Sequence, residues 1–403
     1  MTATRSDGDK RFILGAFAMG HMSNDWAVGS IWLIASAVAV SEGLGSTEVG
    51  WLLTIHGLGS ALAYIPAGLA ADRTTRRGPL LGLTFWWVAI GYFVASFAPS
   101  FWILSMMLAI AVLGDAAWHP IASGVLVQRF PDRRAQVLGI HSMGGTLGAE
   151  VLAPIAVGAI LTFGDWRLAL RLSVIPAVIM GVVFISVSKR LGECAPSPAA
   201  DNSLRALLRP WRTKNGKAFV ATVVLYNMAY MAIVAMMPLF LQQDLEHSAL
   251  YTGVVLAVML TVGSFMQPAV GGLSDRIGRK PIMFGGSILG AGFAAIAGLA
   301  NNEWLAVGGL IGVAGVLTAI RSVVLASAVE LAGDREATNL GMAFTLMDGV
   351  GAFGAVLAGY VGRNDLPNAF LLAAGLALAG ALAARWLDVE SAHQAVATPT
   401  APG

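Results

Sequence analysis

The chain has 403 residues, of which 57% are hydrophobic and 12% charged, and its mean hydropathy is +0.73. Soluble domains carry about 25% charged residues, and a soluble protein this apolar would expose large apolar patches to water. The composition therefore excludes an ordinary soluble protein. The net charge of +2 points to no nucleic-acid partner, and the single Cys194 excludes an intramolecular disulfide and a cysteine-based metal cluster.

Long apolar runs without alternation predict membrane-spanning helices, each of which satisfies its own backbone hydrogen bonds. The first run follows a polar start, so no cleavable signal peptide is expected. The predicted fold class is an all-α membrane protein with twelve transmembrane helices. These are predicted at 11–40, 47–71, 79–98, 101–128, 134–162, 167–188, 217–242, 250–274, 281–300, 303–330, 337–361 and 367–387.

Loop charges predict the orientation of these helices, because short cytoplasmic loops are enriched in Lys and Arg. The loops after the second, fourth and eighth helices are arginine-rich, and the opposite loops hold few cations. Both termini are therefore expected in the cytoplasm, and the expected location is the bacterial cytoplasmic (inner) membrane. The polar stretch 189–216 is predicted to be a cytoplasmic linker between two six-helix bundles, 1–188 and 217–403, the second ending in a short cytoplasmic tail.

Two loops repeat one pattern about 200 residues apart, a spacing typical of transporters built by internal duplication. The first runs from Gly68 through Asp72 to Arg77, and the second from Gly271 through Asp275 to Lys280. Each lies where an even-numbered helix reaches the cytoplasm. The two bundles are therefore expected to be pseudo-symmetric.

The pattern Gly-x-x-x-Asp-Arg-x-x-Arg-Arg/Lys resembles the loop motif between helices 2 and 3 of the major facilitator superfamily. The resemblance implies the major facilitator fold, a monomer, and alternating access to a central cavity. It also implies charge-relay contacts that break during transport, although topology anchoring alone would explain the same charges. The gating residues it implies are Gly68, Asp72, Arg73, Arg76, Asp275, Arg276 and Arg279.

Two shorter elements are similar to the fosmidomycin-resistance branch of this superfamily. One is His21-Met-Ser-Asn24-Asp25 in the first helix, and the other is the His119-Pro120 pair in the fourth. The glycine-rich fifth helix also resembles the glycine-proline motif of drug:proton antiporters. These resemblances imply proton-coupled efflux.

Ionisable residues within the spans indicate the functional face, because such groups are costly in lipid and usually face protein or water. His21, Asn24 and Asp25 share one face of the first helix through spacings of three and four. Asp115 and His119 are four apart on the fourth helix. A carboxylate beside an imidazole can exchange protons near neutral pH. The alternative is a hydrogen-bonded pair that ties the fourth helix to the first.

The fifth helix carries His141 and Glu150, nine residues apart. At 100° per residue they point to opposite sides, and the glycines lie on the His141 side. If this glycine side packs on a neighbouring helix, Glu150 faces the cavity and is the better proton site, while His141 is structural. The predicted proton-coupling set is therefore Asp25, Asp115, His119 and Glu150.

In the second half, Arg321 is the one cation deep in a predicted span. An arginine there would bind an anionic substrate through two hydrogen bonds, or would pair with Asp348. Aromatic and amide side chains complete the predicted cavity. The predicted substrate-binding set is His21, Asn24, Trp118, Tyr226, Asn227, Tyr230, Gln267, Arg321 and Asp348.

Three functions compete on these observations. The favoured one is a secondary active transporter that exports a drug or toxic metabolite by proton antiport. The second is a proton symporter that imports a small organic anion, and the third is a non-transporting receptor or scaffold, which the buried charges disfavour. An enzyme is not expected, because no nucleophile elbow, metal cluster or phosphate loop is present. No cofactor and no metal are predicted; the partners are a small-molecule substrate, protons and the lipid bilayer.

Overall fold

The computed structural model describes residues 7–130, 133–194, 208–332 and 341–388. Within these ranges the chain forms helices and no strand. Residues 195–207 of the predicted linker, residues 337–340 of the eleventh predicted span, and both chain ends lie outside the described residues.

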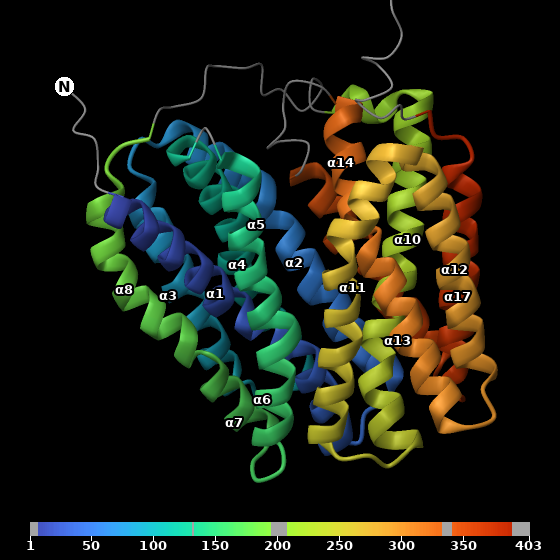
Figure 1. Ribbon diagram of the computed structural model, residues 1–403. Helices are drawn as coiled ribbons and strands as arrows, with labels where there is room; N and C mark the ends of the chain where they lie inside the picture. Colours follow the sequence, from blue (N-terminus) through green and yellow to red (C-terminus); the bar gives the residue numbers. More distant parts are fainter. Residues whose placement is uncertain (1–6, 131–132, 195–207, 333–340, 389–403) are drawn as a thin grey trace, which may run out of the picture. The chain divides into compact units, whose positions relative to one another are not determined.

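The first half is a series of membrane-length helices joined by short loops (Figure 1). Its elements are α1 (Asp7–Glu42), α2 (Ser46–Arg73), α3 (Arg77–Ala95), α4 (Phe101–Arg129), α5 (Arg134–Gly145), η2 (Thr146–Leu152), α6 (Ala153–Ile160), α7 (Trp166–Ser173) and α8 (Ile175–Leu191). Here α5, η2 and α6 form one continuous rod, and α7 and α8 together form the sixth predicted helix. The helix formed by α7 and α8 is interrupted at Val174, two residues before Pro176, whose backbone nitrogen carries no hydrogen to donate.

The second half follows the same plan. Its elements are η3 (Pro210–Arg212), α10 (Lys214–Leu239), η4 (Phe240–Asp244), α11 (Ala249–Ile277), α12 (Arg279–Leu299), α13 (Glu303–Ala319), α14 (Arg321–Ala332), η5 (Thr345–Val350), α16 (Phe353–Val361) and α17 (Pro367–Ala384). The tenth predicted helix is divided at Ile320, so Arg321 begins α14.

Among the described residues, eleven helices are long and apolar enough to cross a membrane. The first helix, α1, has 36 residues but is not one of the eleven. Its polar residues His21, Asn24 and Asp25 lower its mean hydropathy. With α1 included, the predicted fold of twelve helices is confirmed, and the chain is a multi-pass membrane protein.

The chain divides into two compact units whose limits differ from the predicted bundles. Unit 1 comprises Met1–Glu42, Ile55–Ala200 and His247–Ala257, and unit 2 comprises Gly43–Thr54, Asp201–Glu246 and Val258–Gly403. Helices α2 and α11 therefore each contribute to both units.

Close helix packing in unit 1 depends on glycines of the continuous helix formed by α5, η2 and α6. A Cβ atom at Gly144 would lie 2.0 Å from the carbonyl oxygen of Ala18, and one at Gly148 would lie 2.1 Å from that of Met22. Only glycine permits this approach of two backbones, as is common between membrane helices. The glycine side of this helix therefore packs on a neighbouring helix, α1, which is the condition on which the expected direction of Glu150 depends.

Candidate functional site

The predicted polar residues of α1 and α4 meet inside unit 1. Asn24 donates from Nδ2 to Asp115 Oδ1 over 2.9 Å, and both side chains are buried. Asn24 was expected to bind substrate, but in this conformation its amide holds the carboxylate of Asp115. The expected alternative, a hydrogen bond that ties the fourth helix to the first, is thus present in the structure.

Two histidines surround the carboxylate of Asp25. His21 Nε2 lies 3.1 Å from Asp25 Oδ2, and His119 Nε2 lies 4.0 Å from Asp25 Oδ1. His119 Nε2 also lies 3.6 Å from Asp115 Oδ2. The side chains of Asp25, Asp115 and His119 thus form one cluster with His21; the spacing on each helix predicted the shared faces but not that the two faces meet.

Helix α5 closes this cluster from a third side. His21 Nδ1 lies 2.8 Å from the carbonyl oxygen of His141, and the two imidazole rings stack with their centroids 4.1 Å apart. His141 Nδ1 in turn lies 3.2 Å from the carbonyl oxygen of Phe17 on α1. His141 therefore braces α5 against α1, which agrees with its expected structural role.

The same cluster contains the ligand types of a transition-metal site. One ligand atom each from His21, Asp25 and His119 lie within 4.8 Å of one another, and two histidines with one carboxylate suit zinc or iron. However, His21 and Asp25 already contact each other at hydrogen-bond distance. A proton between them satisfies this contact, so the geometry does not require an ion.

Trp118, which was predicted to bind substrate, lies among aromatic side chains in this structure, and its substrate role stays a prediction. Its side chain is completely buried. It packs against Phe17, Phe85 and Phe184, with ring centroids 4.9 to 5.8 Å apart. The residue shares a helix turn with Asp115 and His119, but its indole belongs to the apolar core of unit 1.

Glu150 lies in a π-helical segment that the sequence reasoning did not anticipate. A π-helix has more residues per turn than an α-helix, so a step of 100° per residue does not hold between Gly145 and Glu150. The direction expected for Glu150 therefore stays a prediction. Asp348 of unit 2 also lies in a π-helical segment, η5, about 200 residues later. Such segments are frequent at functional sites.

Two predicted substrate residues of unit 2 are buried and bonded to the backbone. Tyr226 donates its hydroxyl to the carbonyl oxygen of Leu317 over 2.6 Å, and Asn227 donates to that of Met347 over 2.6 Å. Both bonds connect α10 to neighbouring segments. The Tyr226 hydroxyl and the Asn227 amide, which were expected to bind substrate, are engaged in these bonds.

The remaining substrate candidates of unit 2 are half-buried. The charges of Arg321 and Asp348 and the side chain of Tyr230 lie near enough to act on the Tyr226 hydroxyl electrostatically. The guanidinium of Arg321 is also 6.0 Å from the centre of the Phe344 ring. Gln267 presents its backbone carbonyl to the Ser322 hydroxyl at 3.4 Å. The structure thus brings Arg321, Asp348, Tyr226 and Tyr230 into one region, and their substrate contacts stay predictions.

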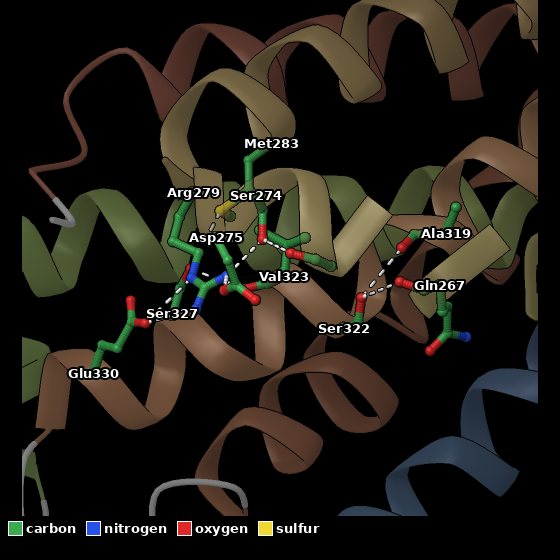
Figure 2. Close-up of polar contacts among 11 residues, drawn as sticks. Gln267, Ser274, Asp275, Arg279, Met283, Ala319, Ser322, Val323, Ser327 and Glu330 are labelled. Carbon is green, nitrogen blue, oxygen red and sulfur yellow. Dashed lines mark hydrogen bonds and ion pairs between the residues drawn. The ribbon is translucent and has the colours of Figure 1, made fainter. Parts of the chain in front are cut away.

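The motif loop of unit 2 forms a compact ion-pair cluster around Arg279 (Figure 2). Arg279 donates to Glu330 from Nη2 over 2.9 Å, and it also donates to Asp275 and to Ser274. Its side chain is buried, whereas that of Asp275 is half exposed. The expected pairing of Asp275 with Arg279 is present, and Arg276 is exposed.

In the motif loop of unit 1, the predicted gating residue Arg76 is not the buried arginine, and its gating role stays a prediction. Arg76 is exposed and pairs with Glu193 over 3.5 Å. The buried arginine is Arg77, which donates from Nε to the carbonyl oxygen of Ala71 over 2.9 Å and lies 3.9 Å from Asp72. Arg73 is exposed, and Gly68 lies beside Pro120 of α4.

Sequence reasoning missed two residues of these loops. Arg77 stands in the motif itself, beside the arginine that was chosen. Glu330 is a lone acid at the C-terminal end of a predicted span, and that position was the available signal. Arg77 and Arg279 both begin a helix, α3 and α12.

The chain matches the family model described as Major Facilitator Superfamily over residues 17–351 and 223–403. The chain belongs to the Major Facilitator Superfamily. Its relatives and its fold are those of transporters and not of enzymes. This membership confirms the family resemblance stated from the loop motif.

Among curated relatives of this superfamily member, the fosmidomycin resistance protein of Escherichia coli (strain K12) is 25% identical over 385 residues, covering 92% of this chain and 91% of the relative. A probable 4-methylmuconolactone transporter of Cupriavidus pinatubonensis (strain JMP 134 / LMG 1197) is 27% identical over 277 residues, covering 64% of each chain.

Solved structures support the same fold. A bacterial homolog of the human lysosomal transporter Spinster, in its inward-facing and occupied conformation, has a TM-score of 0.76 at 16% identity, covering 95% of this chain and 97% of that chain. The nucleoside transporter NupG has a TM-score of 0.74 at 14% identity, covering 93% and 98%. At these identities the structures establish the fold of a major facilitator transporter.

Proposed function

We propose that this chain is a secondary active transporter that exports a small organic molecule, a drug or toxic metabolite, in exchange for protons. The observation that carries the proposal is the cluster of two carboxylates and two imidazoles that joins α1, α4 and α5. Groups that titrate inside a membrane span mark proton pathways in transporters. The name of the fosmidomycin resistance protein supports efflux.

In this proposal Asp25, Asp115, His119 and Glu150 carry the coupling. Protonation shifts the equilibrium between an inward-open and an outward-open state, because a ligand moves such an equilibrium only through different affinities for the two states. The cluster around Arg279 would form in one state and break in the other. Its partners, Asp275 and Glu330, lie on different helices, as such a contact requires.

The experiment measures drug-driven proton movement in proteoliposomes that contain the purified full chain, with fosmidomycin and a panel of cationic and neutral drugs. Asp25→Asn, Asp115→Asn and Glu150→Gln should each reduce proton-coupled flux at least tenfold while the protein stays folded. Glu193→Gln, in the exposed pair with Arg76, is the matched control. Wild-type flux with unchanged pH dependence in all three variants would reject the coupling.

A second candidate, proton-coupled import of a small organic anion, is favoured by Arg321. The guanidinium and the aromatic Phe344, Tyr226 and Tyr230 form one region of unit 2, and Arg binds carboxylates and phosphates through paired hydrogen bonds. Arg321→Ala should then abolish the binding of carboxylates and phosphonates and spare neutral compounds. Equal losses for both classes would reject an anion site.

A further inference from the structure

The contacts of His21 show whether a proton lies between His21 and Asp25. The carbonyl oxygen of His141 only accepts hydrogen bonds, so Nδ1 of His21, 2.8 Å away, carries a hydrogen. Nε2 faces Asp25 Oδ2 at 3.1 Å. A neutral imidazole with its hydrogen on Nδ1 would direct a lone pair at the carboxylate, and the contact would be repulsive. The pair therefore holds one additional proton.

The basicity of the two groups places this proton on His21. Imidazole is a stronger base than a carboxylate in water. Asp25 also has a second imidazole, His119, 4.0 Å from its Oδ1, which favours the ionised carboxylate. An imidazolium at His21 forms a charge-assisted hydrogen bond with that carboxylate, and such bonds are stronger than neutral ones.

His141, whose ring stacks on that of His21, is unsuited to hold the charge. His141 directs Nδ1 at the carbonyl oxygen of Phe17, and its buried Nε2 has no hydrogen-bond partner among the described residues. A proton there would place an unpaired charged donor in the protein interior, at a high cost in free energy. It would also stack two cations with their ring centres 4.1 Å apart.

Gly145 leaves the space that the side chains of His21 and Asp25 occupy. A Cβ atom at this position would lie 2.7 Å from His21 Nε2 and 3.0 Å from Asp25 Oδ2. Gly145 is four residues after His141, so both lie on the same face of α5. One turn of α5 therefore lies beside both nitrogens of the His21 ring. The carbonyl oxygen of His141 faces Nδ1, and Gly145, which has no side chain, lies beside Nε2.

We propose that His21 holds the coupling proton against Asp25, and that Gly145 and the backbone carbonyl of His141 position it. The inference rests on the proposed proton coupling and replaces the substrate role expected for His21. The titratable side chains that face the pair are Asp115 and His119 from α4 and His141 from α5. When the proton leaves, Nε2 and Oδ2 both become acceptors and repel, so the contact between α1 and the turn of α5 loosens.

Nuclear magnetic resonance of ¹⁵N-histidine in the full-length protein, reconstituted in lipid nanodiscs, tests the proposal without a substrate. Among the six histidines, the His21 signals are identified as those lost in His21→Gln. We expect His21 to carry a hydrogen on each ring nitrogen, with the one on Nε2 directed at Asp25. A neutral ring, or a hydrogen on Nε2 alone, would overturn the proposal.

Two variants test the partners. Asp25→Asn removes the negative charge that the imidazolium faces, so His21 should then keep only the hydrogen on Nδ1. Gly145→Ala should shift the Nε2 signal of His21. Gly139→Ala, where a Cβ meets nothing within 4 Å, should not. A hydrogen on Nε2 that persists unchanged in Asp25→Asn rejects the pair, and equal effects of the two alanines reject the positioning role.

These measurements also separate the inference from the proposed function. If His21 carries both hydrogens as expected but the protein moves no protons with any drug, the proton site stands and proton-coupled export fails. If drug-driven proton movement is observed and His21 is neutral throughout, the coupling stands and this inference fails. Zinc-dependent signals of His21 that a chelator removes would identify a metal ligand and overturn the proton assignment.

Discussion

The two repeated motif loops share one pattern of Gly, Asp and Arg but form different ion pairs. In unit 2, Arg279 is buried and donates to two carboxylates, Asp275 and Glu330. In unit 1, the buried arginine is Arg77, one position later in the motif; it donates to a backbone carbonyl and lies 3.9 Å from Asp72. The spacing differs by one residue, because Arg279 is four residues after its aspartate and Arg77 is five.

This difference teaches that the motif specifies a buried arginine at the start of a helix but not its partner. In unit 2, a turn at Gly278 separates Asp275 at the end of α11 from Arg279 at the start of α12, and the guanidinium reaches both Asp275 and Glu330. In unit 1, the next helix begins one motif position later, at Arg77, five residues after Asp72, and Arg77 donates to the end of α2 instead. The two loops are therefore expected to differ in stability and in their response to the loss of one charge.

Removal of the buried cation should give the largest effect. Arg279→Met leaves Glu330 and Asp275 without their shared partner, and we expect the free energy of unfolding to fall by about 2 kcal/mol. The loss stays below that of a fully buried pair because Asp275 is half exposed. Arg77→Met, the matched change in unit 1, should cost about 1 kcal/mol. Thermal unfolding in detergent measures both, and a larger loss for Arg77→Met would contradict the comparison.

Replacing each carboxylate of the Arg279 cluster by its amide should lower the free energy of unfolding more for the more buried acid. Glu330→Gln keeps the shape of the side chain but loses the charge-assisted bond to Arg279, and we expect a loss of about 1 kcal/mol. Asp275→Asn should cost less, since its side chain is 53% exposed and that of Glu330 is 22% exposed. The same thermal assay applies. A reversed order would show that Asp275 is the main partner of Arg279.

The choice between Arg76 and Arg77 shows what the sequence can predict. Hydropathy and loop charge predicted the helices and the loops, because membrane thickness sets the helix length. The choice between neighbouring arginines depends on where α3 begins, and helix ends are uncertain by a few residues. A shift of one residue changes the side-chain direction by about 100°, which decides between an exposed and a buried guanidinium.

The candidate site was predictable to a similar extent. The spacing of His21, Asn24 and Asp25 predicted one shared face, and the structure confirms that this face meets Asp115 and His119. His21 is oriented by the backbone carbonyl of His141, and a pattern of side chains does not predict backbone contacts. The π-helical segment that contains Glu150 likewise has no hydropathy signal, because it changes the hydrogen-bond register and not the composition.

A weaker change in unit 1 sharpens the contrast between the loops. Asp72→Asn should cost about 0.5 kcal/mol or less, because Asp72 is 3.9 Å from Arg77 and its side chain is 41% exposed. The loss in Asp275→Asn should be larger. Parallel unfolding curves for the two variants provide the measurement. Equal losses would mean that the register difference has no energetic consequence.

The smallest effect is expected for the exposed pair of Arg76 and Glu193, whose side chains are 78% and 67% exposed. Glu193→Gln should leave the unfolding temperature unchanged, because water and salt screen exposed charges. The cluster around Arg279 is buried and should respond less to salt than a surface pair of equal strength would. Unfolding of both glutamine variants, Glu193→Gln and Glu330→Gln, is therefore compared at low and high salt. We expect Glu330→Gln to remain destabilising at both salt concentrations; if its effect disappears at high salt, the cluster is screened like a surface pair and the contrast between the two loops does not arise from burial.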